Sequence, residues 1–156
     1  MIALRWRPLE GQSGHEAGRQ LLAQMYEELV GGQMPPILRL PRGKPCFAQG
    51  NVHFSISHSK GHVFCALSDR PIGIDAEELD RKLDLRIADR ILSASEKAQY
   101  DAAPDKRLAL LTFWVLKEAA AKLSGEGINA NPRHTAFSLD DPRVQMTEGC
   151  LVAVIE

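Results

Sequence analysis

Residues 71–77 read PIGIDAE, an apolar stretch that carries two carboxylates. Side chains alternate between the two faces of an extended chain, so Asp75 and Glu77 project from the same side of this predicted strand. Residues 113–122 read FWVLKEAAAK, which predicts an almost wholly apolar helix. Glu118 and Lys122 are four residues apart and therefore share one face of that helix.

Burying charged groups on two apolar elements is unfavourable unless each charge has a partner. The carboxylates of Asp75, Glu77 and Glu118 and the ammonium group of Lys122 therefore need one another, a metal or a ligand. Such a set suits a divalent cation and a phosphate, because Mg²⁺ prefers oxygen ligands and commonly takes few carboxylates together with phosphate oxygens. The alternative is an ordinary exposed pair of Glu118 and Lys122, which would contribute only ~0.3–0.5 kcal/mol.

Length, charge and cysteine content narrow the class of protein. A chain of 156 residues is one compact domain by length, and a net charge of -1 gives no basic field for nucleic acid. No apolar run approaches the ~20 residues of a membrane span, and the N-terminus lacks a signal-peptide core. Cys46, Cys65 and Cys150 are far apart, which argues against a zinc site or a disulfide framework and favours reduced thiols. We expect a soluble cytoplasmic protein without membrane or nucleic-acid partners.

Hydrophobic periodicity and turn residues predict helices and strands that alternate in two halves. The first helix begins at Ser13 and is ended by glycines 31–32, and Ser93 with Glu96 forms a capping box that opens another helix. The predicted helices cover residues 13–31, 93–100 and 106–123. The predicted strands cover residues 52–57, 62–67, 72–77, 135–139 and 144–155. Residues 33–45 have the composition of a basic loop.

Motifs across residues 15–140 resemble those of the 4′-phosphopantetheinyl transferases, in particular the type that activates peptide and polyketide synthetases. That family carries an apolar-Gly-apolar-Asp-x-Glu strand and, further on, a Trp-x-x-Lys-Glu-x-x-x-Lys helix. Here Asp75 precedes Glu118 by 43 positions. Further matches in the family's order are GKP at 43–45, SISHS at 55–59, LSASE at 92–96 and GEGI at 125–128.

The resemblance implies a mixed α/β (α+β) fold of two similar helix-plus-antiparallel-sheet lobes in a pseudo-twofold arrangement, with coenzyme A in the cleft between them. We expect residues 1–156 to be a single, unusually short phosphopantetheinyl transferase domain, with lobe one over about 1–75 and lobe two over about 76–156. The implied reaction is Mg²⁺-dependent transfer of the 4′-phosphopantetheine arm from coenzyme A to a serine of an acyl or peptidyl carrier protein, which releases adenosine 3′,5′-bisphosphate. Mn²⁺ suits the same ligands, and either a monomer or a dimer fits.

The resemblance also implies a role for each matching residue. The residues expected to hold the metal are Asp75, Glu77 and Glu118. Glu118 is also the expected base for the incoming serine hydroxyl. Lys122 is expected to lie against the pyrophosphate and to assist the departing phosphate. The residues expected to bind coenzyme A are Arg19, Lys44, Pro45, Ser57, His58 and Lys117.

Within the coenzyme A set the resemblance distinguishes several contacts. Ser57 and His58 would meet the phosphates, Lys44 with Pro45 would line the nucleotide end, and Arg19 would contact the 3′-phosphate. For each of these the alternative is a solvated or turn residue without a ligand. Lys117 is one position away from the Glu118 face, so it either reaches a phosphate or stabilises the other side of the helix.

Two other functions compete with the transferase. One is a non-catalytic relative that binds coenzyme A or a carrier protein, and the other is a different metal-dependent phosphotransfer or phosphohydrolase enzyme. The complete set of Asp75, Glu77, Glu118 and Lys122 argues against a pure binding protein, because binding alone does not require an acid and a base in register.

Overall fold

The computed structural model describes residues 1–127 and 131–156. Its helices are α1 (Gly14–Leu29), α2 (Ala88–Ile91), α3 (Ala94–Ala102) and α4 (Lys106–Ser124), with short 3-10 segments at Leu85–Ile87 and Pro132–His134. Its strands are β1 (Ala3–Pro8), β2 (Ile37–Arg39), β3 (Pro45–Phe47), β4 (His53–His58), β5 (His62–Ser68), β6 (Gly73–Glu78), β7 (Val144–Thr147) and β8 (Cys150–Ile155). No helix within these residues is both long and apolar enough to cross a membrane.

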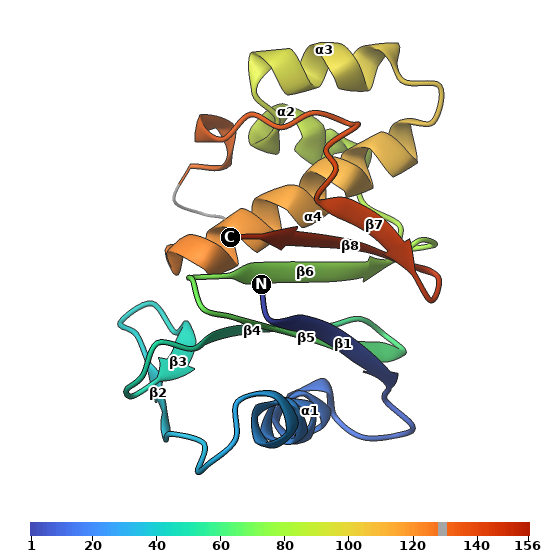
Figure 1. The fold of residues 1–156 in the computed structure, drawn as a ribbon. Helices are drawn as coiled ribbons and strands as arrows, with labels where there is room; N and C mark the ends of the chain where they lie inside the picture. Colours follow the sequence, from blue (N-terminus) through green and yellow to red (C-terminus); the bar gives the residue numbers. More distant parts are fainter. Residues whose placement is uncertain (128–130) are drawn as a thin grey trace.

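The chain is arranged in layers, with two antiparallel sheets between two helices (Figure 1). The first sheet has the order β1-β5-β4 and is covered by α1, and the second has the order β6-β8-β7 and is covered by α4 (Figure 1). The short helices α2 and α3 pack on the far side of α4 (Figure 1). This arrangement confirms the expected mixed α/β fold built from two helix-plus-antiparallel-sheet halves.

Apolar side chains fill the space between successive layers. Those between α1 and the first sheet include Leu21, Leu22, Met25, Phe54 and Leu67. Those between the two sheets include Phe64, Ala66, Ile74, Ala76 and Val152. Those between the second sheet and α4 include Leu111, Val115, Leu116, Leu151 and Ala153. Alternation along β6 therefore directs Ile74 and Ala76 toward the first sheet and leaves Asp75 on the opposite face, toward α4.

The boundary that we expected between the lobes, near residue 75, falls inside β6. The whole of β6 pairs with β8, from Gly73 opposite Ile155 to Glu78 opposite Cys150. We therefore propose that the division lies in residues 69–72, between the end of β5 and the start of β6.

Local signals explain the helix ends. The Ser13 hydroxyl accepts the Glu16 N–H at 3.1 Å before α1. At α3 the capping box is complete, because Ser93 Oγ accepts the Glu96 N–H while Glu96 Oε1 accepts the Ser93 N–H at 2.8 Å. Helix α4 ends at Gly125, whose φ of 74° is left-handed and suits glycine. Of the GEGI motif, Ile128 lies outside the described residues.

The strands differ from those predicted at four places. Strand β1 was missed, and the segment 33–45, read as a basic loop, contains β2 and the start of β3, which pair as a hairpin. The segment 144–155 is two strands, with a turn at Glu148 and Gly149 where φ is positive (52° and 72°).

The predicted strand over residues 135–139 is also absent, because side chains of α3 and α4 bind its backbone. Lys117 donates to the Thr135 carbonyl, and Glu96 accepts the Phe137 N–H. Gln99 donates to the Phe137 carbonyl and accepts the Leu139 N–H. These side chains use the backbone groups that a neighbouring strand would otherwise need.

Gly73, in the first of the two opening motifs, lies where β6 and α4 come closest. A Cβ atom at this position would collide with the Ala119 carbonyl oxygen and would lie 2.5 Å from the Leu123 nitrogen. Only glycine permits this approach. The close contact brings Asp75, two residues further along β6, next to the part of α4 that carries Glu118 and Lys122.

Candidate active site

Asp75 is held at the junction of the two halves of the molecule. Its Oδ1 accepts hydrogen bonds from Ser57 Oγ of β4 at 3.2 Å and from Lys122 Nζ of α4 at 3.0 Å. Its Oδ2 is buried and has no hydrogen-bond partner among the residues that the structure describes. Since an unsatisfied buried polar atom is costly, this oxygen marks a place where a ligand would be stabilised.

Glu77 lies two residues further along the same face of β6. It pairs with Arg81 and accepts a hydrogen bond from Trp114 Nε1 at 3.3 Å. Burial and then the charge of Asp75 raise the pKa of Glu77, while Arg81 and Trp114 oppose the shift.

Glu118 of α4 completes the acidic cluster. Burial is the main cause that raises its pKa, followed by the charge of Asp75, and the Lys122 ammonium group opposes the shift. No hydrogen bond or ion pair joins its carboxylate to another of the described residues. The Glu118 carboxylate therefore has a raised pKa, and its oxygens can accept a proton or bind a cation without breaking a contact to another described residue.

These properties fit a divalent cation with a preference for oxygen. Burial and then the charge of Asp75 raise the pKa of both Glu77 and Glu118, and one buried oxygen of Asp75 has no partner among the described residues. A cation would relieve both features, because it neutralises the repulsion and supplies the missing partner. The residues that would hold it are Asp75, Glu77 and Glu118.

A pocket of about 230 Å³ lies beside this cluster and is lined from both halves. Glu118 and Lys122 form one wall, and Lys44, Pro45 and Phe54 contribute to the other. The structure thus brings four of the predicted site residues to one cavity.

The loop that carries Lys44 is fixed against the end of α4. Lys44 Nζ donates to the Leu123 carbonyl at 2.6 Å, and Arg42 donates to the Glu126 carbonyl at 3.4 Å. Burial lowers the pKa of Lys44, and Cys46 opposes the shift. The basic loop therefore closes the pocket at the C-terminal end of α4.

The remaining predicted coenzyme A residues lie around the first sheet. The Ser57 hydroxyl donates to Asp75 and accepts the Ala76 N–H at 3.0 Å, so it positions Asp75 directly. His58 is exposed at the end of β4, with its ring packed against Gly14 at the start of α1. Contact of Ser57 and His58 with coenzyme A stays a prediction.

Arg19 lies half-buried on α1. Partial burial lowers its pKa, and the nearby charge of Arg39 lowers it further. The two guanidinium groups therefore form a local excess of positive charge, and contact of Arg19 with a phosphate stays a prediction.

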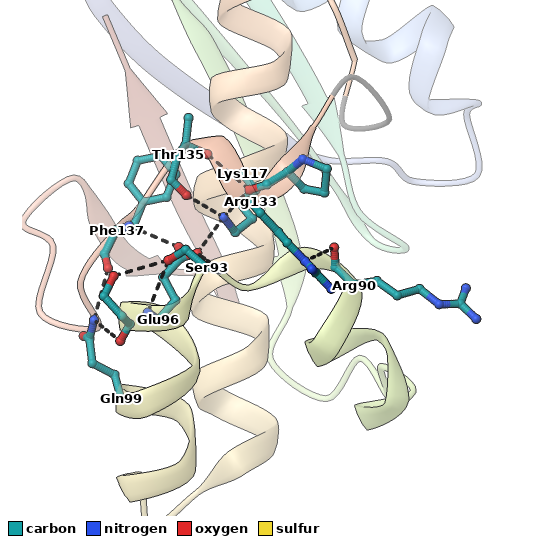
Figure 2. Close-up of polar contacts among 10 residues, drawn as sticks. Arg90, Ser93, Glu96, Gln99, Lys117, Arg133, Thr135 and Phe137 are labelled. Carbon is teal, nitrogen blue, oxygen red and sulfur yellow. Dashed lines mark hydrogen bonds and ion pairs between the residues drawn. The ribbon is translucent and has the colours of Figure 1, made fainter.

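Lys117 of α4 pairs with Glu96 of α3 (Figure 2), which supports its alternative role of stabilising the other side of the helix, and its contact with coenzyme A stays a prediction. Its Nζ lies 2.7 Å from Glu96 Oε1, and only 1% and 0% of the two side chains are exposed. It also donates to the carbonyl oxygens of Pro132 at 2.5 Å and Thr135 at 2.8 Å. Three acceptors thus satisfy the ammonium group, and Lys117 stabilises the other side of α4.

Sequence reasoning missed two contributions to the site. Arg81 pairs with Glu77 from four residues away, but the turn that permits this pair was not recognised. Ser57 was assigned to a ligand rather than to Asp75, because its contact with β6 depends on how the two halves meet. The available signal was a serine that alternates with apolar residues, two strands before the acidic strand in the chain.

The fold and the cluster define a protein of two α/β halves with a carboxylate site at their junction, and comparisons with known proteins agree. The family profile described as the 4′-phosphopantetheinyl transferase superfamily matches residues 71–149, which contain all three carboxylates. The chain therefore belongs to the 4′-phosphopantetheinyl transferase superfamily.

Individual relatives match over part of their length. The 4′-phosphopantetheinyl transferase psf-1 of Bacillus pumilus is 35% identical over 117 residues, which cover 74% of this chain and 46% of that protein. The 4′-phosphopantetheinyl transferase Sfp of Bacillus subtilis (strain 168) is 38% identical over 91 residues, which cover 56% of this chain and 40% of that protein. The chain spans about half the length of the curated relatives it matches, or less.

Among solved structures, the holo-[acyl-carrier-protein] synthase of Thermotoga maritima is 24% identical. That match has a TM-score of 0.45 and covers 54% of this chain and 60% of the other.

Proposed function

We propose that this protein transfers the 4′-phosphopantetheine arm from coenzyme A to a serine hydroxyl of an acyl or peptidyl carrier protein. The observation that carries the proposal is Asp75, which both halves hold and which has one buried oxygen without a partner in the described part of the chain, beside Glu77 and Glu118. The relatives named 4′-phosphopantetheinyl transferases support the same activity.

In the proposed reaction, the serine oxygen forms a bond to the phosphorus that carries the pantetheine arm. The bond from that phosphorus to the bridging oxygen of the pyrophosphate breaks, and adenosine 3′,5′-bisphosphate leaves with the electron pair. The serine proton passes to the Glu118 carboxylate, whose raised pKa suits a general base and which accepts no hydrogen bond from the other described residues.

Lys122 stabilises the leaving group in this scheme. Its ammonium group faces Asp75 and lines the pocket, so it lies where negative charge would develop on the departing phosphate. Mg²⁺, or Mn²⁺, bound to Asp75, Glu77 and Glu118 would neutralise phosphate oxygens.

Coenzyme A would lie along the pocket. Lys44 and Pro45 are proposed to contact the nucleotide end, and His58 the phosphates. Arg19 is proposed to meet the 3′-phosphate, and the adjacent charge of Arg39 favours an anion there. As part of the proposal, the protein acts in the cytoplasm, as a monomer or a dimer.

Intact-protein mass spectrometry tests this function. Apo carrier proteins would be incubated with coenzyme A, Mg²⁺ and the protein, and the expected result is a mass gain of one phosphopantetheine arm. The gain should be lost with EDTA and with Asp75→Ala. It should be kept with Glu27→Gln, a control that removes an exposed carboxylate from α1.

The transfer assay, together with calorimetry and a measurement of coenzyme A breakdown, separates the competing functions. Binding of coenzyme A in calorimetry without a mass gain on any carrier would support a non-catalytic binding protein. Metal-dependent breakdown of coenzyme A without transfer would support another phosphotransfer or phosphohydrolase enzyme. Full transfer by Asp75→Ala would contradict the proposed site.

A further inference from the structure

A second set of possible metal ligands lies on the other face of β6. Glu78 follows Glu77 and therefore points to the opposite side of the strand, toward the first sheet. There it meets His62 at the start of β5 and Cys150 at the start of β8. The three ligand atoms all lie within 4.8 Å of one another.

The distances between these atoms approach those of a tetrahedral zinc site. His62 Nδ1 lies 3.6 Å from Glu78 Oε1 and 3.9 Å from Cys150 Sγ. Bond lengths of about 2.0–2.1 Å to nitrogen and oxygen and about 2.3 Å to sulfur imply tetrahedral edges of about 3.4 and 3.6 Å. The distances from His62 to Glu78 and to Cys150 are therefore within a few tenths of an ångström of those that one shared ion requires.

The ligand types select zinc over magnesium. A thiolate and an imidazole are the ligands that Zn²⁺ prefers, whereas Mg²⁺ requires oxygen. Burial raises the pKa of the Cys150 thiol to about 11, so the ion would have to displace the thiol proton, as metals do at thiol ligands generally.

Neighbouring groups already hold the ligands in position. Glu78 Oε1 accepts hydrogen bonds from Ser59 Oγ at 2.8 Å and from the Gly61 N–H at 3.1 Å. The Trp6 and His62 rings meet edge to face, with centroids 5.7 Å apart. Such outer contacts orient metal ligands and raise affinity. The side chains of His62 and Glu78 are 22% and 23% exposed, which leaves solvent access for an ion.

We propose that His62, Glu78 and Cys150 bind one zinc ion, with a solvent molecule in the fourth position. The ion would join the first sheet, through β5, to the second sheet, through β6 and β8. Its role would be structural, because it ties together the two halves that form the carboxylate site. This proposal does not depend on the transferase activity.

Cobalt substitution tests the site on the full chain. The protein would be stripped with a chelator, saturated with Mg²⁺ to fill the carboxylate site, and titrated with Co²⁺. We expect one equivalent of Co²⁺ to give the absorption band of a cobalt–thiolate bond. The carboxylate site contains no sulfur, so it cannot produce that band.

Variants identify the ligands. Cys150→Ser should abolish the band, and Cys46→Ser, which removes a thiol from β3, should keep it. His62→Gln alters a partly exposed side chain, so it keeps the test valid if the buried Cys150 variant does not fold. It should abolish the rise in melting temperature that Zn²⁺ produces in the Mg²⁺-saturated protein. Ser59→Ala should weaken cobalt binding roughly ten- to a hundredfold and keep the band.

Three results would overturn the proposal. One is the absence of a thiolate band at stoichiometric Co²⁺, and another is a band that survives in Cys150→Ser. The third is an equal thermal shift by Zn²⁺ in the unmodified chain and in His62→Gln. The trio would then be a hydrogen-bonded cluster without a metal.

Discussion

Replacing Lys117 with methionine would show whether this lysine supports the fold or binds coenzyme A. Methionine keeps an apolar side chain of similar length and removes the ammonium group that pairs with Glu96 and donates to the Pro132 and Thr135 carbonyls. The Glu96 carboxylate, with 0% of its side chain exposed, would then lack its cation.

The size of the effect follows from these contacts. Removing one partner of a buried ion pair typically costs ~3–5 kcal/mol. Glu96 would still accept the N–H groups of Ser93 and Phe137, which moderates the loss. Thr135 is exposed, so water can replace the lysine at that carbonyl. We therefore expect the unfolding free energy to fall by ~3–4 kcal/mol, a large share of the ~5–15 kcal/mol of a typical domain.

Urea unfolding followed by circular dichroism measures this loss, and the KM for coenzyme A of the remaining folded protein should be unchanged. Lys122→Met is the matched control, because it makes the same change on the same helix at a partly exposed lysine. It should reduce turnover strongly and stability little. A Lys117→Met protein of normal stability but with a raised KM would refute our assignment and restore Lys117 as a ligand of coenzyme A.

Three further changes test other parts of the structure. Glu118→Gln should abolish transfer. Because the folded-state pKa of Glu118 is raised, ionising it costs stability, so the metal-free protein should lose stability as pH rises above about 4.3 and the variant should lose less. Urea unfolding at several pH values measures this difference, and transfer at the normal rate would contradict the mechanism. Gly73→Ala should lower the free energy of unfolding by at least ~1–3 kcal/mol, because the added methyl group meets the backbone of α4. An unchanged melting temperature would show that β6 and α4 do not pack this closely. Ser93→Ala should cost ~1 kcal/mol in chemical unfolding and leave transfer intact, whereas a loss of transfer alone would point to a role in the site.

The helices were predictable because their signals are local. Ser13 and Ser93 accept backbone N–H groups at the starts of α1 and α3, and Gly125 adopts the left-handed conformation that ends α4. Each of these residues lies at the helix end that it defines, so the local sequence was sufficient to predict that end. The acidic cluster could also be predicted from the sequence, because Asp75 and Glu77 follow strand alternation and Glu118 with Lys122 follows helical spacing.

The features that the sequence did not predict depend on contacts with residues far away in the chain. Strand β1 is an edge strand that contains two arginines, and its pairing is defined by β5, about 60 residues away in the chain. Residues 135–139 are extended but bind side chains, and no local pattern distinguishes that from a strand. The cluster of His62, Glu78 and Cys150 arises from three strands, so the spacing of cysteines and histidines in the sequence gave no indication of it.

The serine hydroxyls of β4 also affect how the protein behaves when it is concentrated. Each sheet ends at the junction in an edge strand, β4 on one side and β6 on the other, and open edges recruit strands from other chains. Ser55 and Ser57 accept the N–H groups of Ile74 and Ala76 at 3.1 and 3.0 Å, so β6 has fewer free donors along that edge. The side chain that orients Asp75 therefore also protects against aggregation, and substitutions there should lower the soluble yield as well as the activity.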